Sequence, residues 1–191
     1  EIIGLGGLVG ETIQDHCRAW IDRCFEYVCD TKDRCPRVKL HGFGVTSHAL
    51  MVSYPWWSVD STTWTKCGAF GGIWVPRKKG GVFIYDEPAI NVKVSLESPT
   101  RVFEGQHYKT MRKGERAHVD EWLKLINVPM GENNGEEIIT KGVINSSSIR
   151  KVACLLFYER MAASLPQYPW PFHSRRKDGK TLRALLSRRE A

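Results

Sequence analysis

Apolar positions in the first third of the chain follow a repeating order of short apolar run, turn and amphipathic segment. Residues 2–5 form an apolar run that breaks into a glycine-rich turn. From residue 11 to about 29, apolar side chains recur at steps of three and four, which is one face of a helix: Ile13, Cys17, Trp20, Ile21, Cys24 and Val28. The pattern predicts a strand, a glycine loop and a helix in succession.

Two further apolar runs predict two more units of this kind. Residues 37–40 end at His41-Gly42-Phe43-Gly44, and a short helix is expected to follow through about Ser53. Residues 56–59 end at Asp60. Strands that alternate with helices favour an α/β fold with a parallel sheet, and such folds place functional groups at the carboxyl ends of the strands.

After Trp64 the pattern changes to a β-rich region and then to helices. Two strands are expected around a basic, glycine-containing turn, with a further strand, over residues 71–76, 80–85 and 90–96. Helices are expected at 118–126 and 148–163, a loop at 130–135, and a last short basic helix at 181–189. Three prolines between residues 166 and 172 must interrupt regular structure. The predicted domains are β/α units over 1–65, a hairpin and helical extension over 66–172, and a basic tail over 173–191.

Length and composition indicate an ordinary globular protein. The chain has 191 residues, of which 42% are hydrophobic, enough for one domain or part of a larger one. No apolar stretch reaches the length of a bilayer-spanning helix, and the first ten residues lack the order of a secretory signal. The six cysteines do not resemble a disulfide scaffold, so we expect reduced thiols, a cytoplasmic protein and no membrane contact. The chain starts with Glu1 rather than Met, which predicts processing, truncation or a start inside a longer reading frame.

The net charge of +7 is concentrated at the C-terminus. From residue 173 onward the local charge is +5, from seven basic residues against Asp178 and Glu190: Arg175, Arg176, Lys177, Lys180, Arg183, Arg188 and Arg189. Such a cluster favours contact with a polyanion, because neutralised phosphates release counterions. A solvated tail is the alternative. Shorter basic runs at Arg77-Lys78-Lys79 and at 109–116 point the same way as the polyanion reading.

Asp60 and His41 are the candidate chemical groups at the strand ends. A carboxylate such as Asp60 can act as a nucleophile toward a sugar carbon, as a metal ligand, or as a helix cap. A lone histidine such as His41 is more often a hydrogen-bonded structural residue than a catalyst. The glycines that follow the first strand let a ligand approach the backbone, although a tight turn is the other interpretation.

Cysteines and tryptophans give weaker signals. Cys17, Cys24, Cys29 and Cys35 lack the close pairs of structural zinc sites, and two of them fall on the apolar face of the first helix, so core packing is favoured over metal binding. Trp56, Trp57 and Trp64 near one strand end are able to stack a base, or simply belong to the core.

Taken in order, these segments resemble the C-terminal half of the tRNA-guanine transglycosylase barrel, and most of all its phage and bacterial DNA-modifying relatives. The family's Gly-Gly-Leu-x-x-Gly-Glu-like loop is similar to Gly6-Gly7-Leu8-Val9-Gly10-Glu11, which is one residue shorter. Its Gly-x-Gly turn followed by Thr resembles 42–46, and its nucleophilic aspartate matches Asp60 of Ser-Val-Asp-Ser-Thr-Thr-Trp. A Gly-x-x-x-x-basic hairpin resembles 72–77. The likeness covers roughly residues 1–85.

The resemblance implies base exchange in a polynucleotide. An aspartate attacks the anomeric carbon, guanine leaves, and a 7-deazaguanine base displaces the enzyme. The implied base contacts are Gly6, Gly7, Leu8, His41, Gly42 and Trp64. The implied nucleic-acid contacts, made while the target base is turned out of its stack, are Arg77, Lys78, Lys79, Arg175, Arg176 and Lys177.

Two departures from the family refine the expectation. The tRNA enzymes carry a zinc site of closely spaced cysteines and a histidine after the nucleophile, whereas only Cys67 lies in that region here, so we expect no metal or other cofactor and favour DNA over tRNA. The family's other acidic residues lie on earlier strands, and a closed barrel needs about 200–250 residues. We therefore expect a fragment, a second chain that supplies the N-terminal half of the barrel, or a relative that binds without catalysis.

Three functions stay open at this point. The first is a transglycosylase, or its C-terminal part, with Asp60 as nucleophile. The second is a non-catalytic nucleic-acid-binding module with the same fold. The third is an α/β enzyme that binds a nucleotide or sugar phosphate through the glycine loop.

Overall fold

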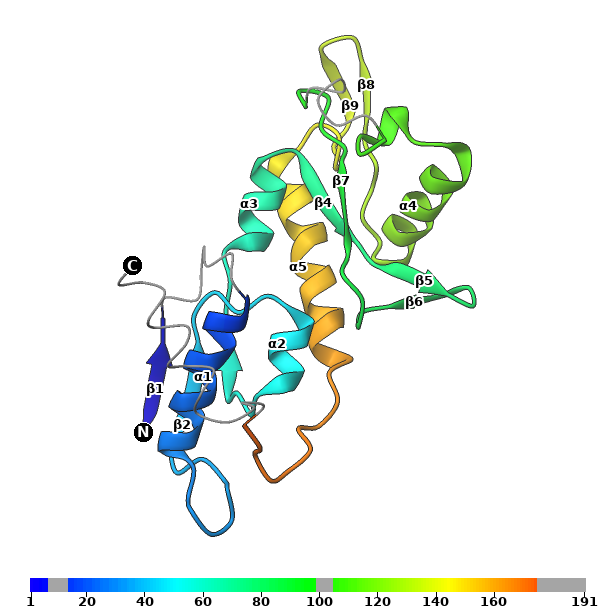
Figure 1. The fold of residues 1–191 in the computed structure, drawn as a ribbon. Coiled ribbons are helices and arrows are strands. Elements are labelled where there is room, and N and C mark those ends of the chain that lie inside the picture. Colours follow the sequence, from blue (N-terminus) through cyan, green and yellow to red (C-terminus); the bar gives the residue numbers. More distant parts are fainter. Residues whose placement is uncertain (7–13, 99–104, 175–191) are drawn as a thin grey trace, which may run out of the picture. The chain divides into compact units, whose positions relative to one another are not determined.

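The computed structural model describes residues 1–6, 14–98 and 105–174. The described residues form two compact units, one from the ranges 1–61 and 166–174 and one from the range 62–165. Figure 1 labels most elements of both units. The chain therefore leaves the first unit after Ser61 and returns to it at Pro166.

The first unit contains a three-stranded parallel sheet in the order β1 (Ile2–Leu5), β2 (Lys39–Gly42) and β3 (Ser58–Val59). Helix α1 (Gln14–Val28) connects β1 to β2, and α2 (His48–Ser53) connects β2 to β3. Parallel neighbours require such crossover connections, so the strand and helix order of the sequence and the topology agree. The α/β class is confirmed.

One face of this sheet carries the core of the first unit. Leu5 and Leu40 pack against α1, whose apolar face includes Ile21 and Phe25, both fully buried. Strand side chains alternate between faces, which is why these two leucines share one side. The core also takes in Cys29, Tyr54 and Phe172, with Cys17, Cys24, Val28, Val38, Leu50, Trp56 and Tyr168 packed partly against it. The expected apolar role of the α1 cysteines is confirmed, and all described cysteines are free thiols.

Within the described part of the chain, the opposite face of the same sheet carries exposed apolar side chains. Ile2 and Trp57 are 61% and 59% exposed, and Phe43 is 49% exposed. Parallel sheets normally have both faces covered. Neither this sheet nor any other formed by the described residues closes into a barrel. The structure thus shows an open α/β sheet where the family resemblance implies strands of a closed one.

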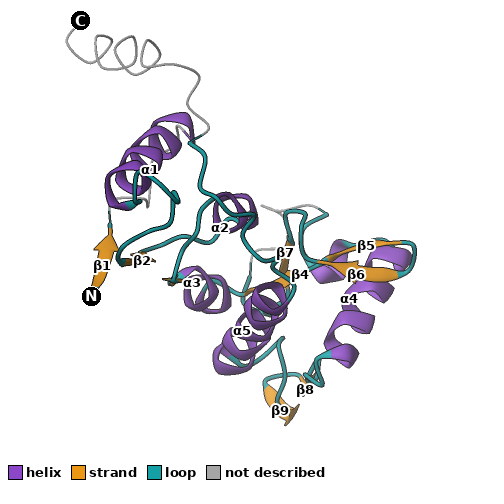
Figure 2. Ribbon diagram, turned by 90° about the horizontal axis from the view of Figure 1, so that it is seen from below, coloured by secondary structure: helices purple, strands orange, loops and turns teal. Residues whose placement is uncertain are grey.

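The second unit combines a two-stranded antiparallel sheet with two packed helices. Strand β4 (Gly72–Val75) pairs with β7 (Ile90–Lys93), while α3 (Thr63–Ala69) and α5 (Ser147–Ala163) pack side by side, as Figures 1 and 2 show. Gly68 permits this close packing, because a Cβ there would lie 2.7 Å from the backbone nitrogen of Lys151. The expected helix at 148–163 is confirmed, and α3 is an addition to the predicted elements.

Two hairpins and one more helix complete the second unit. Strand β5 (Arg77–Lys79) pairs with β6 (Val82–Ile84), and β8 (Glu132–Asn134) with β9 (Glu137–Thr140). A short 3₁₀ helix (Tyr108–Thr110) precedes α4 (Lys113–Leu125). The predicted loop at 130–135 was wrong, since it contains β8. The basic run expected to form a turn was also wrong, since it is strand β5, and β4 pairs with β7 rather than with β6.

The remaining expectations concern the chain after α5. Residues 166–172 contain no regular element, as the three prolines predicted. The expected helix at 181–189 lies outside the described residues. Among the described helices, none combines the length and apolar character that crossing a membrane requires.

Candidate active site

The carboxyl ends of the three parallel strands meet at one edge of the sheet. Leu5 is in register with Gly42, and Gly42 with Val59. The residues that follow each strand are held there by backbone hydrogen bonds: the Phe43 N–H donates to the Leu5 carbonyl at 2.9 Å, and the Asp60 N–H donates to the Gly42 carbonyl at 3.2 Å. The turn after β2 and the carboxylate after β3 are therefore neighbours.

Glycines shape the turn after β2. A Cβ on Gly42 would lie 2.8 Å from the Val45 side chain and 3.0 Å from the Trp56 ring, so a side chain has no space there. Gly44 has a φ of +75°, a conformation that favours glycine. Together they aim the Gly44 N–H at the segment after β3.

Asp60 accepts this N–H. Its Oδ1 lies 3.0 Å from the Gly44 nitrogen, and its Oδ2 lies 3.7 Å from Nε2 of His41. The Asp60 side chain is nevertheless 56% exposed. Helix α3 has Thr62 as its N-cap residue, so Asp60 is not the cap of that helix. One carboxylate oxygen anchors the turn, and the other faces a histidine at an open edge.

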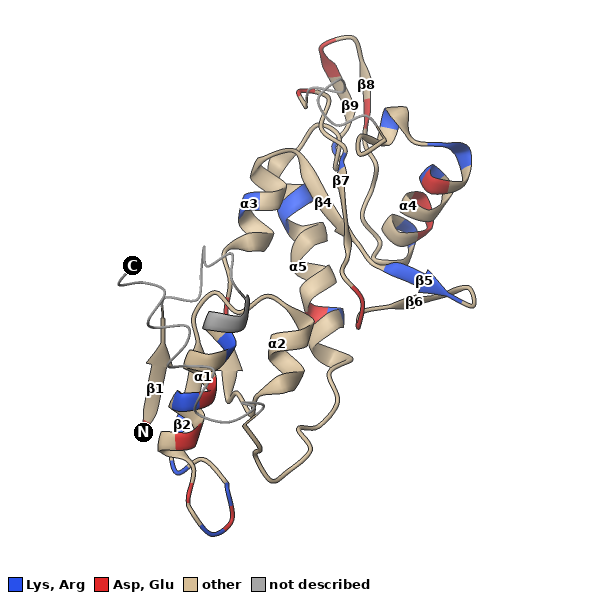
Figure 3. Ribbon diagram, in the orientation of Figure 1, with Lys and Arg blue, Asp and Glu red and all other residues tan. Residues whose placement is uncertain are grey.

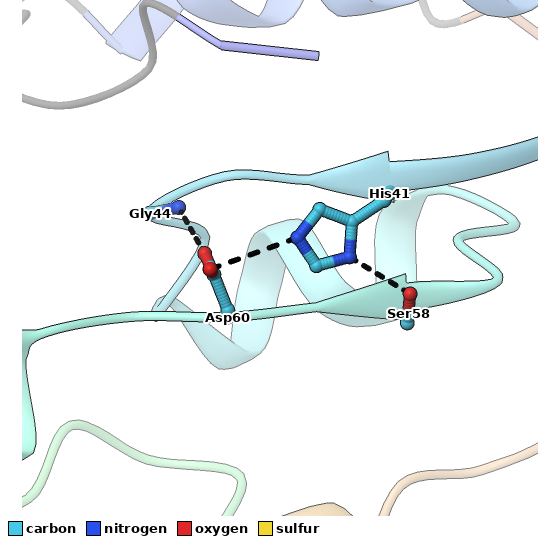
Figure 4. A network of polar contacts seen from close by, with 4 residues as sticks. All are labelled: His41, Gly44, Ser58 and Asp60. Atoms are coloured by element: carbon cyan, nitrogen blue, oxygen red, sulfur yellow. Dashed lines mark hydrogen bonds and ion pairs between the residues drawn. The ribbon is translucent and has the colours of Figure 1, made fainter. Parts of the chain in front are cut away.

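His41 lies between Asp60 and Ser58 (Figure 4). Its Nδ1 is 2.8 Å from Oγ of Ser58, and its ring meets Phe43 edge-on with centroids 4.5 Å apart. Register explains the pair, because His41 and Ser58 are direct partners on β2 and β3. Ser58 is a site residue that was not predicted from the sequence. The signal was available in Ser58-Val59-Asp60, since residues two apart near a strand end share a face.

The tryptophans near this edge have different surroundings. Trp56 packs against the core and donates its Nε1–H to the Leu50 carbonyl at 3.1 Å. Trp57 is exposed, and the Lys39 ammonium lies 3.6 Å from its ring centroid, which is a cation–π contact. Of this pair, Trp57 has a ring surface that a ligand can reach.

The other residues expected to bind the base are distributed more widely. Gly6 follows β1 and is exposed, with open space where a Cβ would lie. Gly7 and Leu8 lie outside the described residues. Trp64 is on α3 in the second unit. The structure thus brings Gly42, His41 and Asp60 together at the strand ends where Gly6 also lies.

The expected nucleic-acid contacts on β5 are partly neutralised. Arg77 pairs with Glu87 at 3.9 Å and donates to the Pro88 carbonyl, and Lys78 pairs with Glu121. Lys79 is exposed, and no ion pair to it is found within the described residues. Figure 3 shows basic residues on β5 and around the start of α4. Arg175, Arg176 and Lys177 lie outside the described residues.

No group of three or more His, Cys, Asp or Glu side chains able to hold a metal ion occurs within residues 1–6, 14–98 and 105–174. Comparisons with models of protein families, with curated proteins and with solved structures find no match to this chain. The function must therefore be inferred from the side chains at the strand ends.

Proposed function

We propose that the first unit carries the nucleophile of a base-exchange transglycosylase that replaces guanine in a polynucleotide by a 7-deazaguanine. The observation that carries the proposal is Asp60 itself. Its carboxylate is fixed through Oδ1 by the Gly44 N–H, yet more than half of the side chain is exposed at the carboxyl edge of a parallel sheet. Active sites of α/β folds lie at this edge.

The reaction uses the two oxygens of Asp60 differently. Oδ2 attacks the anomeric carbon, the glycosidic bond to guanine breaks, and an aspartyl-sugar ester forms. The incoming deazaguanine then attacks the same carbon and releases the carboxylate. The Gly44 N–H stays hydrogen-bonded to Oδ1 in both steps. This bond orients the carboxylate and leaves Oδ2 available to attack.

The polynucleotide must present its base outside the stack. The residues proposed to line the base are those of the strand ends and the glycine loop of the first unit: Gly6, Gly7, Leu8, His41 and Gly42. Lys79 and the basic residues Arg175, Arg176 and Lys177 are proposed to hold the phosphates. DNA is the substrate proposed first and tRNA second, in line with the resemblance noted in the sequence.

The open sheet supports the proposal that a second chain completes the fold. β1 and β3 each have one unpaired edge within the described part of the chain, and the face with Ile2 and Trp57 is exposed. Additional strands, supplied by another chain, would complete a barrel on these edges and cover that face. They would also bring further acidic groups to the base.

Exchange of labelled base tests the proposal. The protein is incubated with labelled guanine or a labelled 7-deazaguanine and with DNA or tRNA, and incorporation is compared between the wild type and Asp60→Asn. Asp60→Asn keeps the size of the side chain but removes the nucleophile. We expect incorporation and a covalent sugar adduct at Asp60 in the wild type only. Equal incorporation by both proteins would exclude Asp60 as the nucleophile.

A non-catalytic nucleic-acid-binding module is the second candidate, and one contact favours it. The Asp60 Oδ1 bond to Gly44 gives the carboxylate a structural role in the turn, which needs no chemistry. This candidate predicts that Asp60→Ala leaves polynucleotide affinity and biological activity unchanged, with no adduct in the wild type.

A further inference from the structure

Base exchange requires a proton to be given and taken back. Guanine leaves a sugar as an anion unless a nitrogen of the base is protonated, and the incoming deazaguanine must lose the proton of the nitrogen that forms the new bond. We propose that His41 performs both transfers through Nε2, and that Ser58 is the positioning residue that keeps the other ring nitrogen protonated. This inference rests on the proposed function and adds the acid and base to it.

The ring of His41 is held with its two nitrogens facing different partners. Nδ1 is 2.8 Å from the Ser58 hydroxyl, which is a hydrogen bond, while Nε2 is 3.7 Å from Asp60 Oδ2, which is too long for one. The Phe43 ring meets the imidazole edge-on and fixes its plane. Nδ1 is therefore engaged, whereas no hydrogen bond to Nε2 is found within the described part of the chain.

The distances place Nε2 within reach of the departing base. A carboxylate oxygen in position to attack lies about 3–3.5 Å from the sugar carbon, and the breaking carbon–nitrogen bond adds about 1.5 Å, so the base nitrogen lies roughly 5 Å from Oδ2. Nε2 lies 3.7 Å from that same oxygen. Nε2, Oδ2 and the base nitrogen then form a triangle, and its third side, from Nε2 to the base nitrogen, matches the length of a hydrogen bond of about 3 Å.

The steps balance in protons and charge. The proposed cycle starts with a proton on each ring nitrogen of His41 and with Asp60 as a carboxylate, and in it Nδ1–H donates to Ser58. When Oδ2 bonds to the sugar carbon, the Nε2 proton passes to the base, and neutral guanine leaves neutral imidazole behind. When deazaguanine attacks, its N–H proton passes to Nε2 and the carboxylate is released. No other reactant is needed.

Asp60 is the carboxylate that faces His41, and Lys39 is the cation on the same strand and face, turned onto the Trp57 ring. β1 places Gly4 opposite His41, and β3 places Ser58 there, so neither adds a charge. Asp60 loses its negative charge when it becomes an ester, and in the same step the Nε2 proton passes from His41 to the base, so the total charge of the pair does not change.

Two oligonucleotides with different leaving bases distinguish a general acid from a residue with a purely structural role. An oligonucleotide with 7-methylguanine releases a base that leaves without added protonation, whereas ordinary guanine requires it. Single-turnover formation of the Asp60 adduct is measured with both oligonucleotides. For His41→Asn we expect adduct formation from guanine to fall by about 10²–10⁴-fold, typical of a lost general acid, and adduct formation from 7-methylguanine to stay within about tenfold of the wild type. Asp60→Asn is the matched control and is expected to fail with both.

Ser58 is tested in the same assay with a conservative rescue. Ser58→Ala is expected to slow the guanine reaction by about tenfold, because the hydrogen bond to Nδ1 is lost, and to leave the 7-methylguanine reaction unchanged. Ser58→Thr keeps the hydroxyl on a strand position that threonine favours, and is expected to restore the guanine reaction. If His41→Asn or Ser58→Ala slows both reactions equally, the inference is overturned while the proposed function stands. If the wild type forms no adduct from either oligonucleotide, the proposed function itself fails.

Discussion

The turn at the candidate site requires a residue without a side chain at position 42, which is Gly42. The position lies at the end of β2, with Val45 and Trp56 where a Cβ would be. We expect Gly42→Ala to lower the free energy of unfolding by about 1–3 kcal/mol, as overpacking of a filled site does. Urea unfolding followed by tryptophan fluorescence measures this.

Gly6→Ala is the matched control for that substitution. Gly6 lies at the end of the neighbouring strand, and a Cβ there meets no atom of the described residues within 4 Å. An alanine at an unstrained open position reduces the entropy of the unfolded chain, so we expect no loss of stability and a gain of up to about 1 kcal/mol. Equal destabilisation by both substitutions would contradict the packing described around Gly42.

Tyr108 gives a prediction in alkaline solution. Its hydroxyl donates to Asp120 Oδ1 at 2.7 Å, and burial, followed by this hydrogen bond and the carboxylate charge, raises the pKa of Tyr108 to about 12. Because this pKa exceeds that of an unfolded tyrosine near 10, the folded state holds the proton more tightly. The contribution to stability is complete below pH 10 and is lost as the pH rises through about 12.

Ultraviolet titration of the tyrosines checks this direction. In the native protein, part of the tyrosinate absorbance should appear only near pH 12, and Tyr108→Phe should reduce that late fraction. Tyr158, whose pKa burial also raises to about 12, accounts for the rest of it. A titration complete by pH 10.5 would contradict the contacts of both residues.

The sequence predicts those site residues that follow directly after a strand. It does not predict a residue whose partner depends on how two strands align. Asp60 and His41 were selected because each ends an apolar run. Ser58 was not, because the pairing of His41 with Ser58 depends on how β2 and β3 align, which is fixed by the packing of Leu40 and the turn at Gly42.

At the scale of elements, the β5–β6 hairpin carries two neighbouring lysines that differ in whether their charge is paired. Lys78 is paired with Glu121 and lies over the Phe83 ring, whereas Lys79 next to it is exposed. If the hairpin contacts a polynucleotide, Lys79→Ala should reduce the slope of log affinity against log salt by about 0.7–0.9, the value for one phosphate contact. Lys78→Ala should change the slope little, because its charge is already opposed.

Filter binding or fluorescence anisotropy at several salt concentrations gives these slopes. Glu121→Gln serves as a complementary control, since it frees the charge of Lys78 and should make the slope steeper. An unchanged slope in Lys79→Ala would remove this hairpin from the nucleic-acid interface and leave the C-terminal basic residues to provide it.

Periodicity predicted the long elements well and the short ones poorly. Helices α1 and α5 follow clear three-and-four spacing over four turns or more, so local pattern and tertiary packing agree. Helix α4 begins at Lys113, five residues before the expected start, because the Glu115 carboxylate accepts the Arg112 N–H at 2.8 Å and caps a polar first turn. The turn of the β5–β6 hairpin is Gly80-Gly81, and both glycines have a positive φ. Because the turn is this short, the basic residues before it pair with β6 as a strand.

At the scale of the whole molecule, each unit has one buried residue that joins segments distant in the chain. In the first unit, Phe172 is fully buried against Phe25 and Tyr54, and its carbonyl accepts Arg34 Nε–H at 3.2 Å. It ties the returning segment to α1. Hydrophobic spacing could not predict this, because the segment is irregular and the contact spans more than a hundred residues.

In the second unit Arg150 has the corresponding role. Its guanidinium is buried and donates to the carbonyls of Gly68 and Val143, both at 2.9 Å, which joins α5 to the end of α3. Burial lowers the pKa of Arg150, and two carbonyl acceptors each take one of its N–H donors. On the helical pattern alone, this arginine reads as a surface position of α5.

The two residues together test whether the units are separate cooperative parts. Phe172→Ala should cost about 3–5 kcal/mol through the cavity it leaves, and Arg150→Met about 2–4 kcal/mol through two unsatisfied carbonyls. The residues share no partner, so in the double variant each unit should be destabilised as much as in the corresponding single variant, within about 0.5 kcal/mol. Hydrogen exchange read peptide by peptide gives the location: Phe172→Ala should deprotect α1 and leave α5 protected, and Arg150→Met should do the reverse. Loss of protection in both helices from either single substitution would mean that the two units unfold as one.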